Sequence, residues 1–375
     1  MARAERILIV GGGIGGLTLA TALRRHGFTP ELIELSPVWR TVGAGMAIHP
    51  NGLRVLRALG LGAAIERAGT VIGHWDYCDQ RGAVLAETDL EALWGDVGPS
   101  IGITREELQR VLVAANADVP TRLGIWITSL GFDDGGVSVA LSDGSTATYD
   151  LVVGADGIWS TVRQLAVDPT RPVYGGQMVW RSLAPIRPRG LRKLQVLLGD
   201  GCFFGLCPVG DGQTYGFGSV AGPRTIDPRE GRLSRLRERF ARFGDVVQQF
   251  LGALECDDQV HCSPVYWVAA ERWYVGRVVL IGDAAHASLP MMGQGGSLAV
   301  EDAYVLAESL RSAATVHGAL ADYVERRCRR VRWVRQQSQI AADSLRLPVP
   351  IRNAAFRACG DEMMRQRFRP LVSVP

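Results

Sequence analysis

The first 35 residues alternate between strand-like and helix-like patterns of apolar positions. Residues 6–10 form a short, largely apolar run that ends at glycine, which predicts a buried parallel strand. Apolar residues then recur at helical spacing over residues 16–26, and Gly27 marks the expected end of the helix. The run PELIEL at residues 30–35 predicts a second strand. This order of elements predicts an α/β fold that begins with a strand, a helix and a strand.

Two later segments repeat the pattern of a strand followed by a turn. Apolar positions alternate at residues 137, 139 and 141, a turn follows at 143–144, and residues 151–154 predict a further strand. Residues 278–281 predict another short buried strand. It is followed by a glycine-rich loop and a helix expected to start near Ser297.

The pattern changes between about residues 172 and 268. Strand-like runs separated by glycine turns replace the earlier alternation of strands and helices, and they predict an antiparallel sheet. One helix is expected after the middle strands of this sheet. Its apolar positions are Leu233, Leu236, Phe240, Phe243 and Val247. After residue 310 we expect one long helical region, ALADYVERRCRRVRWVRQQSQIAADSL, and then a tail.

Composition and charge favour a globular enzyme. The chain has 375 residues, 47% of them apolar and 21% charged, which suits one large domain or two closely joined ones. The net charge is only +3, and the arginine cluster VERRCRRVRWVRQQ has helical periodicity. We therefore interpret that cluster as a solvated helix face, and we expect no nucleic-acid partner.

The cysteines and the hydropathy pattern bear on location. Seven cysteines are scattered along the chain without a CxxC pair, which argues against a disulfide framework and against a zinc site. No apolar run approaches ~18 residues, so we expect neither a membrane span nor a signal peptide. A cytoplasmic protein with reduced thiols and no metal is the prediction.

The strand-to-helix turn near the start of the chain carries the first chemical signal. Gly11, Gly13 and Gly16 fit the spacing GxGxxG, in which glycines allow a tight turn, a close pyrophosphate and close packing of helix on strand. Glu34 ends the next strand, where an acidic side chain can accept the ribose hydroxyls of an adenosine. These residues predict a site for a dinucleotide that contains adenosine.

Two further motifs, GADGIWSTVR and GDAAHASLPMMGQGG, follow in order. With all three motifs present, the sequence resembles the class A flavoprotein monooxygenases, the family of the para-hydroxybenzoate and salicylate hydroxylases. The resemblance implies a Rossmann-like FAD-binding domain with an inserted antiparallel β-sheet substrate domain and C-terminal helices. The implied boundaries are 1–171 for the first part of the FAD-binding domain, 172–268 for the substrate domain, and 269–375 for the second FAD-binding part with the C-terminal helices.

The resemblance also implies which residues hold FAD. Gly11, Gly13, Gly16 and Glu34 would bind the ADP half, and Asp283 would bind the ribityl chain. The remaining implied cofactor contacts are Arg40, Gly45, Arg105, Asp156, Gly293, Gly295 and Gly296. The sequence departs from the family at Ser297, where an Asn is common; either residue suits a helix start.

Candidate catalytic and substrate residues are harder to assign. His49, Arg181 and Pro290 are the catalytic candidates; His49 is either a proton acceptor for a phenol or a structural histidine. His286 is interpreted as positioning its motif. Half of the side chains of an alternating strand face a pocket, so only some of five aromatic residues would line it: Trp180, Phe203, Phe204, Tyr215 and Phe217.

The function implied by the resemblance is a single-component monooxygenase. NADPH or NADH would bind only transiently to reduce FAD, and the absence of a second GxGxxG matches this. A flavin hydroperoxide would then transfer oxygen to a small aromatic or polyketide-like substrate. The other partners would be molecular oxygen and at most a second copy of the chain, as a monomer or homodimer.

Three other functions are compatible with a flavin-binding fold. A FAD-dependent dehydrogenase or reductase would lack oxygen transfer, and a non-catalytic flavin-binding sensor would not oxidise NAD(P)H. A flavin halogenase needs a catalytic lysine near the flavin, yet the single lysine, Lys193, falls in the expected sheet domain.

Overall fold

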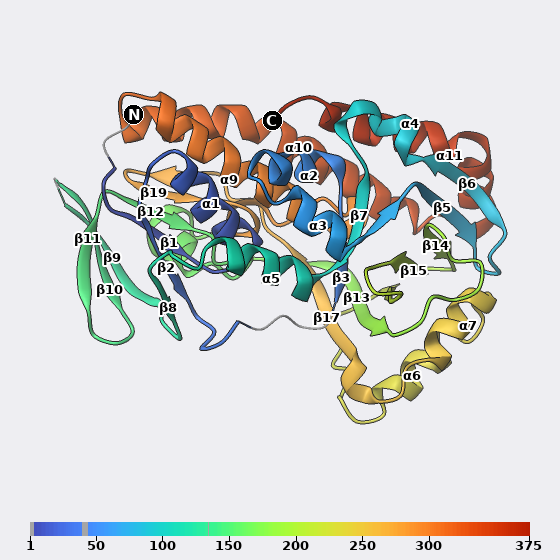
Figure 1. Cartoon of the computed structure of the whole chain (residues 1–375). Helices are drawn as coiled ribbons and strands as arrows, with labels where there is room; N and C mark the ends of the chain where they lie inside the picture. Colours follow the sequence, from blue (N-terminus) through green and yellow to red (C-terminus); the bar gives the residue numbers. More distant parts are fainter. Residues whose placement is uncertain (1–3, 40–43, 134) are drawn as a thin grey trace.

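The computed structural model describes residues 4–39, 44–133 and 135–375 (Figure 1). Its first sheet has six strands in the order β18-β19-β12-β1-β2-β8, parallel except for the β18–β19 pair. The strands are β1 (Ile7–Val10), β2 (Pro30–Glu34), β8 (Thr121–Leu123), β12 (Leu151–Gly154), β18 (Tyr274–Val275) and β19 (Val278–Leu280). The strands predicted near residues 6–10, 30–35, 151–154 and 278–281 are confirmed within one residue at each end.

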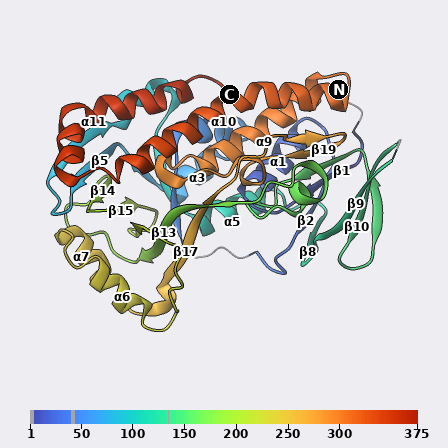
Figure 2. The ribbon, with the colours of Figure 1, turned by 180° about the vertical axis from the view of Figure 1, so that it is seen from behind.

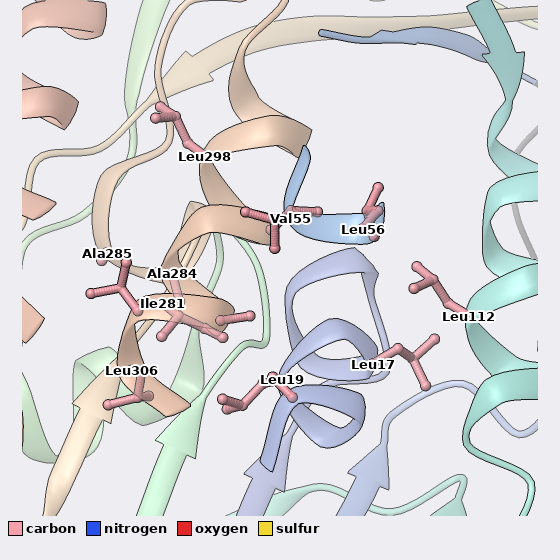
Figure 3. Packing of buried hydrophobic residues seen from close by; sticks show 14 of the residues in the cluster. Leu17, Leu19, Val55, Leu56, Leu112, Ile281, Ala284, Ala285, Leu298 and Leu306 are labelled. Atoms are coloured by element: carbon pink, nitrogen blue, oxygen red, sulfur yellow. The ribbon is translucent and has the colours of Figure 1, made fainter. Parts of the chain in front are cut away.

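Helices cover one face of this sheet. They are α1 (Ile14–Arg25), α5 (Arg105–Ala115) and α9 (Gly295–Ser312). Figure 3 shows Leu17 on the side of α1 that faces Leu112 of α5, and Leu19 on the side toward Leu306 of α9. All four leucines are buried, so α1 is held by apolar contacts on two sides.

Smaller elements surround the sheet. A three-stranded antiparallel sheet of β9 (Ile127–Asp133), β10 (Gly136–Leu141) and β11 (Thr146–Tyr149) projects at one end of the molecule (Figure 1). A second small sheet consists of β3 (Gly45–Ile48), β7 (Ser100–Thr104) and β4 (Thr70–Ile72). The short helical segments are α2 (Pro50–Ala58), α3 (Gly62–Ala68), α4 (Leu90–Trp94), η1 (Gly95–Val97), η2 (Arg163–Val167), η3 (Asp257–Gln259), α8 (Asp283–His286) and η4 (Pro290–Met292).

The large sheet has seven strands in the order β17-β13-β16-β15-β14-β5-β6. Its strands are β5 (His74–Asp79), β6 (Val84–Asp89), β13 (Val173–Ala184), β14 (Leu194–Leu198), β15 (Cys202–Pro208), β16 (Thr214–Ala221) and β17 (Val260–Trp267). All pairs are antiparallel except β14 with β5. The predicted segment 172–268 thus supplies most of an antiparallel sheet, and residues 74–89, which lie far earlier in the chain, complete it.

The segment behind this sheet is two helices, so the prediction of one helix is wrong. α6 (Arg232–Arg239) and α7 (Asp245–Gly252) are separated at Gly244, where a Cβ would lie 2.4 Å from the carbonyl oxygen of Arg81. The five apolar residues that suggested one helix are all buried in one cluster behind the sheet. Their spacing continues through the turn, which explains why the break was not visible in the sequence.

The chain finishes with two long helices rather than one helix and a tail. α10 (Val316–Ser344) packs on α9, and α11 (Val349–Val372) turns back along α10 and reaches β5 and β6 of the large sheet (Figure 2). Several buried positions of α11 hold polar residues or glycine, namely Arg352, Asn353, Gly360 and Arg367. These residues hide the apolar periodicity that would have predicted the helix. No helix of the described residues is long and apolar enough to cross a membrane.

Candidate active site

The turn between β1 and α1 shows three different uses of glycine. Gly11 has a φ of +110°, and a Cβ on it would lie 2.4 Å from the carbonyl oxygen of Ala155; a Cβ on Gly16 would lie 1.9 Å from the carbonyl oxygen of Gly11. A Cβ on Gly13, by contrast, would have no atom of a described residue within 4 Å. Gly13 is also the N-cap of α1, and no side chain caps this helix. The turn therefore leaves free backbone N–H groups and open space, as a pyrophosphate requires.

Glu34 lies beside this turn at the end of β2. Its Oε2 accepts a 2.7 Å hydrogen bond from the backbone N–H of Gly12, and its Oε1 accepts one of 2.8 Å from Ser36. The carboxylate is thus fixed at the carboxyl edge of the sheet, where the fold places an acidic partner for ribose. Arg40, predicted to contact the cofactor, lies outside the described residues.

The middle motif follows β12. Asp156 Oδ2 accepts hydrogen bonds from the backbone N–H groups of Thr161 (2.7 Å) and Val162 (3.1 Å), while its buried Oδ1 has no partner within the described part of the chain. Burial raises the pKa of this carboxyl. Arg163, fully buried, donates to the carbonyl oxygens of Ile158, Thr170 and, at 2.7 Å, Ala284. Since Ala284 belongs to the late motif, Arg163 joins the two motifs directly.

The buried carboxylate of Asp302 contacts two residues of the late motif and fixes the motif in place. Asp302 on α9 accepts a 2.8 Å hydrogen bond from the N–H of Gly282 and lies 2.6 Å from Nε2 of His286. Arg327 on α10 donates a 2.8 Å hydrogen bond to its other oxygen. Although burial opposes the effect, His286 and Arg327 lower the pKa of Asp302 to about 2. This contact fits the role predicted for His286, which is to position its motif.

Arg327 comes from the arginine cluster that the sequence suggested was a solvated face. That interpretation is wrong for Arg327, which is fully buried, and for Arg330, which is nearly so. Both arginines pair with the buried Glu301 at 2.8 Å. Asn51 of α2 donates to Glu301 (3.1 Å) and to Gln294 of the late glycine loop (3.0 Å). Arg327 and Arg330 of the arginine cluster are thus linked, through Glu301 and Asn51, to the late glycine loop.

The late glycine loop approaches other segments closely. Gly293 has a φ of +62°, and a Cβ there would lie 3.1 Å from Nε2 of His49; one on Gly296 would lie 2.4 Å from Cε of Met46. α9 begins at Gly295, slightly earlier than predicted, and its N-cap residue provides no side-chain cap. The N-terminus of α9 is thus free to face a ligand, and it favours negative charge there.

A cavity of about 680 Å³ lies between this loop and the large sheet. Nine of the predicted site residues line it, and they are Gly45, His49, Arg105, Arg181, Asp283, Pro290, Gly293, Gly295 and Gly296. The other described candidates, Gly11, Gly13, Gly16, Glu34 and Asp156, are not among the lining residues. They lie at the ends of β1, β2 and β12, where the adenosine part of an extended dinucleotide is expected.

The large sheet presents alternate side chains to the cavity. Phe203, Tyr215 and Phe217 line it, whereas Trp180 and Phe204 point to the other face and pack against Phe240. This division is the one that alternation along strands requires.

His49 occupies a tight aromatic setting beside the cavity. It is 1% exposed, its ring stacks on Trp75 with centroids 6.1 Å apart, and its Nδ1 lies 3.4 Å from Oγ of Ser100. Its buried Nε2 has no hydrogen-bond partner among the described residues. Burial lowers the pKa of His49 to about 4, so the ring is neutral near pH 7.

The cavity carries an excess of positive charge. Arg105, Arg181, Arg224 and Arg367 line it, and Asp283 is the only carboxylate among its lining residues. Arg181 donates a 2.8 Å hydrogen bond to Oγ of Ser263. This balance suits an anionic ligand.

Sequence reasoning missed one end of the cavity. Trp75, Tyr77, Phe356 and Arg367 line it there, and they come from β5 and from α11. The alternation in HWDYCD was the available signal for β5. The segment that forms α11 was expected to be a tail, and it gave no signal.

The βαβ glycine turn, the acidic end of β2 and the second glycine loop at a helix N-terminus together define a flavoprotein that binds an extended dinucleotide. The open cradle at Gly13, the uncapped start of α9 and the position of Asp283 fit FAD. A family model described as "FAD binding domain" matches residues 5–338.

Known proteins that are similar to this chain are also flavoproteins. The chain is 37% identical over 323 residues to "Aurachin C monooxygenase/isomerase" from Stigmatella aurantiaca, covering 84% of this chain and 83% of the relative. It is 32% identical over 338 residues to "FAD-dependent urate hydroxylase" from Klebsiella pneumoniae, covering 87% of each. The crystal structure of HpxO from Klebsiella pneumoniae with FAD and uric acid superimposes with a TM-score of 0.87 at 27% identity, covering 98% of this chain and 95% of the other.

The chain belongs to the class A FAD-dependent aromatic monooxygenase family, as its resemblance indicated. It is an enzyme of the FAD-dependent monooxygenase type, with FAD as its cofactor. The relatives give no support to the dehydrogenase and sensor alternatives. Lys193 forms ion pairs with Asp76 (2.9 Å) and Glu87 and does not line the cavity, which also disfavours a halogenase.

Proposed function

We propose that this enzyme is a single-component hydroxylase that uses NADPH or NADH and molecular oxygen to hydroxylate a small aromatic substrate. The observation that carries this proposal is the single cavity shared by the late glycine loop and the aromatic face of the large sheet. The names of relatives, including "3-amino-4-hydroxybenzoate 2-monooxygenase" from Streptomyces platensis at 34% identity, support an aromatic substrate. Bound FAD would supply the redox chemistry with oxygen.

The residues of this chain would bind and orient the cofactor. The N–H groups around Gly13 would hold the pyrophosphate and Glu34 the ribose, while Asp283 would bind the ribityl chain. The N-terminus of α9 would stabilise negative charge at the pyrimidine edge of the reduced ring. Arg40, Arg105 and Asp156 keep the cofactor roles that the family resemblance implies.

His49 would serve as an acceptor at the reacting end of the cavity. Because its pKa is about 4, the ring is neutral at working pH, and Nε2, which has no hydrogen-bond partner among the described residues, would accept a hydrogen bond from a substrate hydroxyl in the tautomer that leaves it unprotonated. Arg181 would orient the substrate through the hydrogen-bonding groups that its contact with Ser263 leaves free. Pro290 would shape the wall of the cavity beside the glycine loop, as its lining position allows.

The test is anaerobic mixing of the purified flavoprotein with NADPH or NADH while the flavin absorbance is followed. The mixing is repeated with phenols, heteroaromatic compounds and polyketides. A compound that strongly accelerates bleaching, and is hydroxylated when oxygen is admitted, would support the proposal. A yellow protein that neither donor bleaches under any condition would reject it. His49→Gln is expected to slow hydroxylation more than it slows bleaching, and the exposed His317→Gln variant is the matched control.

Three finer predictions from the sequence stay proposals. They are a polyketide-like substrate as an alternative to a single ring, a monomer or homodimer, and a cytoplasmic location, which the seven unpaired cysteines favour. Product analysis, light scattering and cell fractionation test them in turn.

A further inference from the structure

Arg367 is a buried arginine that has no oppositely charged partner among the described residues. It lies on α11, is 7% exposed, and forms no ion pair within the part of the chain that the structure describes. Its guanidinium likewise makes no hydrogen bond to any described residue. It lines the cavity.

The other deeply buried arginines all have charged or polar partners, although Nη1 of Arg327 has none among the described residues. Arg163 donates to three carbonyl oxygens, Arg327 pairs with Glu301 and Asp302, and Arg352 bonds the carbonyl oxygens of Leu198 and Gly199 and the side chain of Asn353. None of these three lines the cavity. The buried arginine without partners is therefore the one that reaches the ligand space.

The surroundings of Arg367 are aromatic and apolar. Trp75 and Tyr77 of β5 and Phe356 of α11 line the cavity with it, and the Tyr77 and Phe356 rings lie 4.8 Å apart between centroids. The alternate residues of β14 add Leu194, Val196 and Leu198. A flat ring fits such a wall, and the hydroxyl of Tyr77, on which the charge of Arg367 acts, is a polar group of the same wall.

Arg367 is well separated from the other polar end of the cavity. The strand register places Tyr77, Val196, Gly205, Phe217 and Arg181 in one row across five neighbouring strands. Four strand spacings separate the backbones of Tyr77 and Arg181, or about 19 Å. An anion beside Tyr77 and Arg367 therefore does not need Arg181.

A charge in the apolar wall of a cavity is costly unless water or a ligand reaches it, and a bound anion would supply the opposite charge. The planar guanidinium matches a carboxylate, with two parallel hydrogen bonds. We propose that Arg367 binds the carboxylate of an aromatic substrate whose ring packs against Trp75, Tyr77 and Phe356. This proposal rests on the proposed function and narrows the substrate to aromatic carboxylates.

The experiment compares carboxylates with uncharged amides of the same shape. Benzoate with benzamide and 2-naphthoate with 2-naphthamide are titrated into the FAD-loaded enzyme, and the dissociation constant is read from the change in the flavin spectrum. We expect at least one carboxylate to bind at least tenfold more tightly than its amide. Arg367→Met should abolish this preference, Arg367→Lys should retain part of it, and Arg369→Met, at an exposed position of the same helix, should keep it.

Thermal stability separates a binding role from a structural one. Because Arg367 has no partner to lose, Arg367→Met should leave the melting temperature of the ligand-free enzyme unchanged or raised. A carboxylate preference that survives in Arg367→Met, or no preference for any of the four probes, would overturn the proposal. Oxidation of NAD(P)H without any probe reports separately on the proposed function, which can hold even where the carboxylate preference fails.

Discussion

The guanidinium of Arg163 donates a hydrogen bond of 2.7 Å to the carbonyl oxygen of Ala284. The two residues are 121 positions apart and belong to the middle and late motifs. Their contact means that the two motifs form one connected piece of structure, with the loop after β12 fixed against the loop after β19.

Replacing Arg163 by Met should therefore loosen both loops. Three carbonyl oxygens lose their donor, and we expect a loss of about 3 kcal/mol or more in the free energy of unfolding. Urea unfolding and the FAD content of the purified protein measure the effect. Arg171→Met, at an exposed position nearby, is the control. Equal stability of the two variants would show that the contact does not support the site.

The glycine turn offers a contrast between folding and cofactor binding. Gly16→Ala forces a Cβ onto the carbonyl oxygen of Gly11, so the variant should lose both stability and FAD. Gly13→Ala has space for the new methyl group in the protein itself, so it should fold but hold FAD at least tenfold more weakly.

Fluorescence titration with FAD and thermal melting of the apoprotein distinguish these two outcomes. Gly252→Ala, at an open helix end with an ordinary backbone conformation, should change neither quantity. Tight FAD binding by Gly13→Ala would contradict the assignment of the pyrophosphate to that space.

His49 should make stability depend on pH between neutral and mildly acidic conditions. Its pKa is about 4 in the folded protein, below the 6.5 of an exposed histidine, so the unfolded state binds the proton first as the pH falls. The free energy of unfolding should therefore drop by about 2 kcal/mol from His49 alone between pH 7.5 and pH 5.

Urea unfolding at both pH values tests this linkage. His49→Gln should show a drop smaller by that amount, whereas His317→Gln, at an exposed position, should behave like the wild type. An unchanged pH dependence in His49→Gln would mean that His49 is protonated in the folded state.

Replacing Asp302 should lower the free energy of unfolding strongly. Asp302→Asn leaves the buried Arg327 with less opposing charge and weakens the contacts with His286 and Gly282, so we expect a loss of about 3–5 kcal/mol. Because its pKa is lowered from 3.8 to about 2, its contribution is present above pH 3.8 and disappears as the pH falls toward 2. Thermal melting against Asp343→Asn, an exposed control, measures the difference.

The parts of the fold that depend on residues close together in the chain could be predicted from the sequence. The βαβ unit, the three glycine motifs and the antiparallel character of residues 172–268 follow from short apolar runs and from turns that require glycine. The break between α6 and α7 did not, because the apolar spacing of Phe240, Phe243 and Val247 runs through it.

Buried polar residues account for most of what was missed. Arg327 was interpreted as solvated because its ion-pair partners, Glu301 and Asp302, lie on another helix. Arg367 sits where an apolar residue would have revealed α11, and its position in the cavity depends on how that helix returns to β5. Pairings between distant segments decide both cases, and a single sequence does not display them.

Because α11 returns to the large sheet, part of the cavity wall comes from a segment outside the region that matches the FAD-binding family. The region that matches the FAD-binding family stops at residue 338, and α11 begins at Val349. Phe356 and Arg367 therefore lie outside the matched region. The end of the same helix is tied to the site, because Phe368 packs on His49 and the carbonyl oxygen of Leu371 accepts a hydrogen bond from Arg330. A change of substrate is thus best sought at single wall positions of α11 and not by exchange of the whole helix.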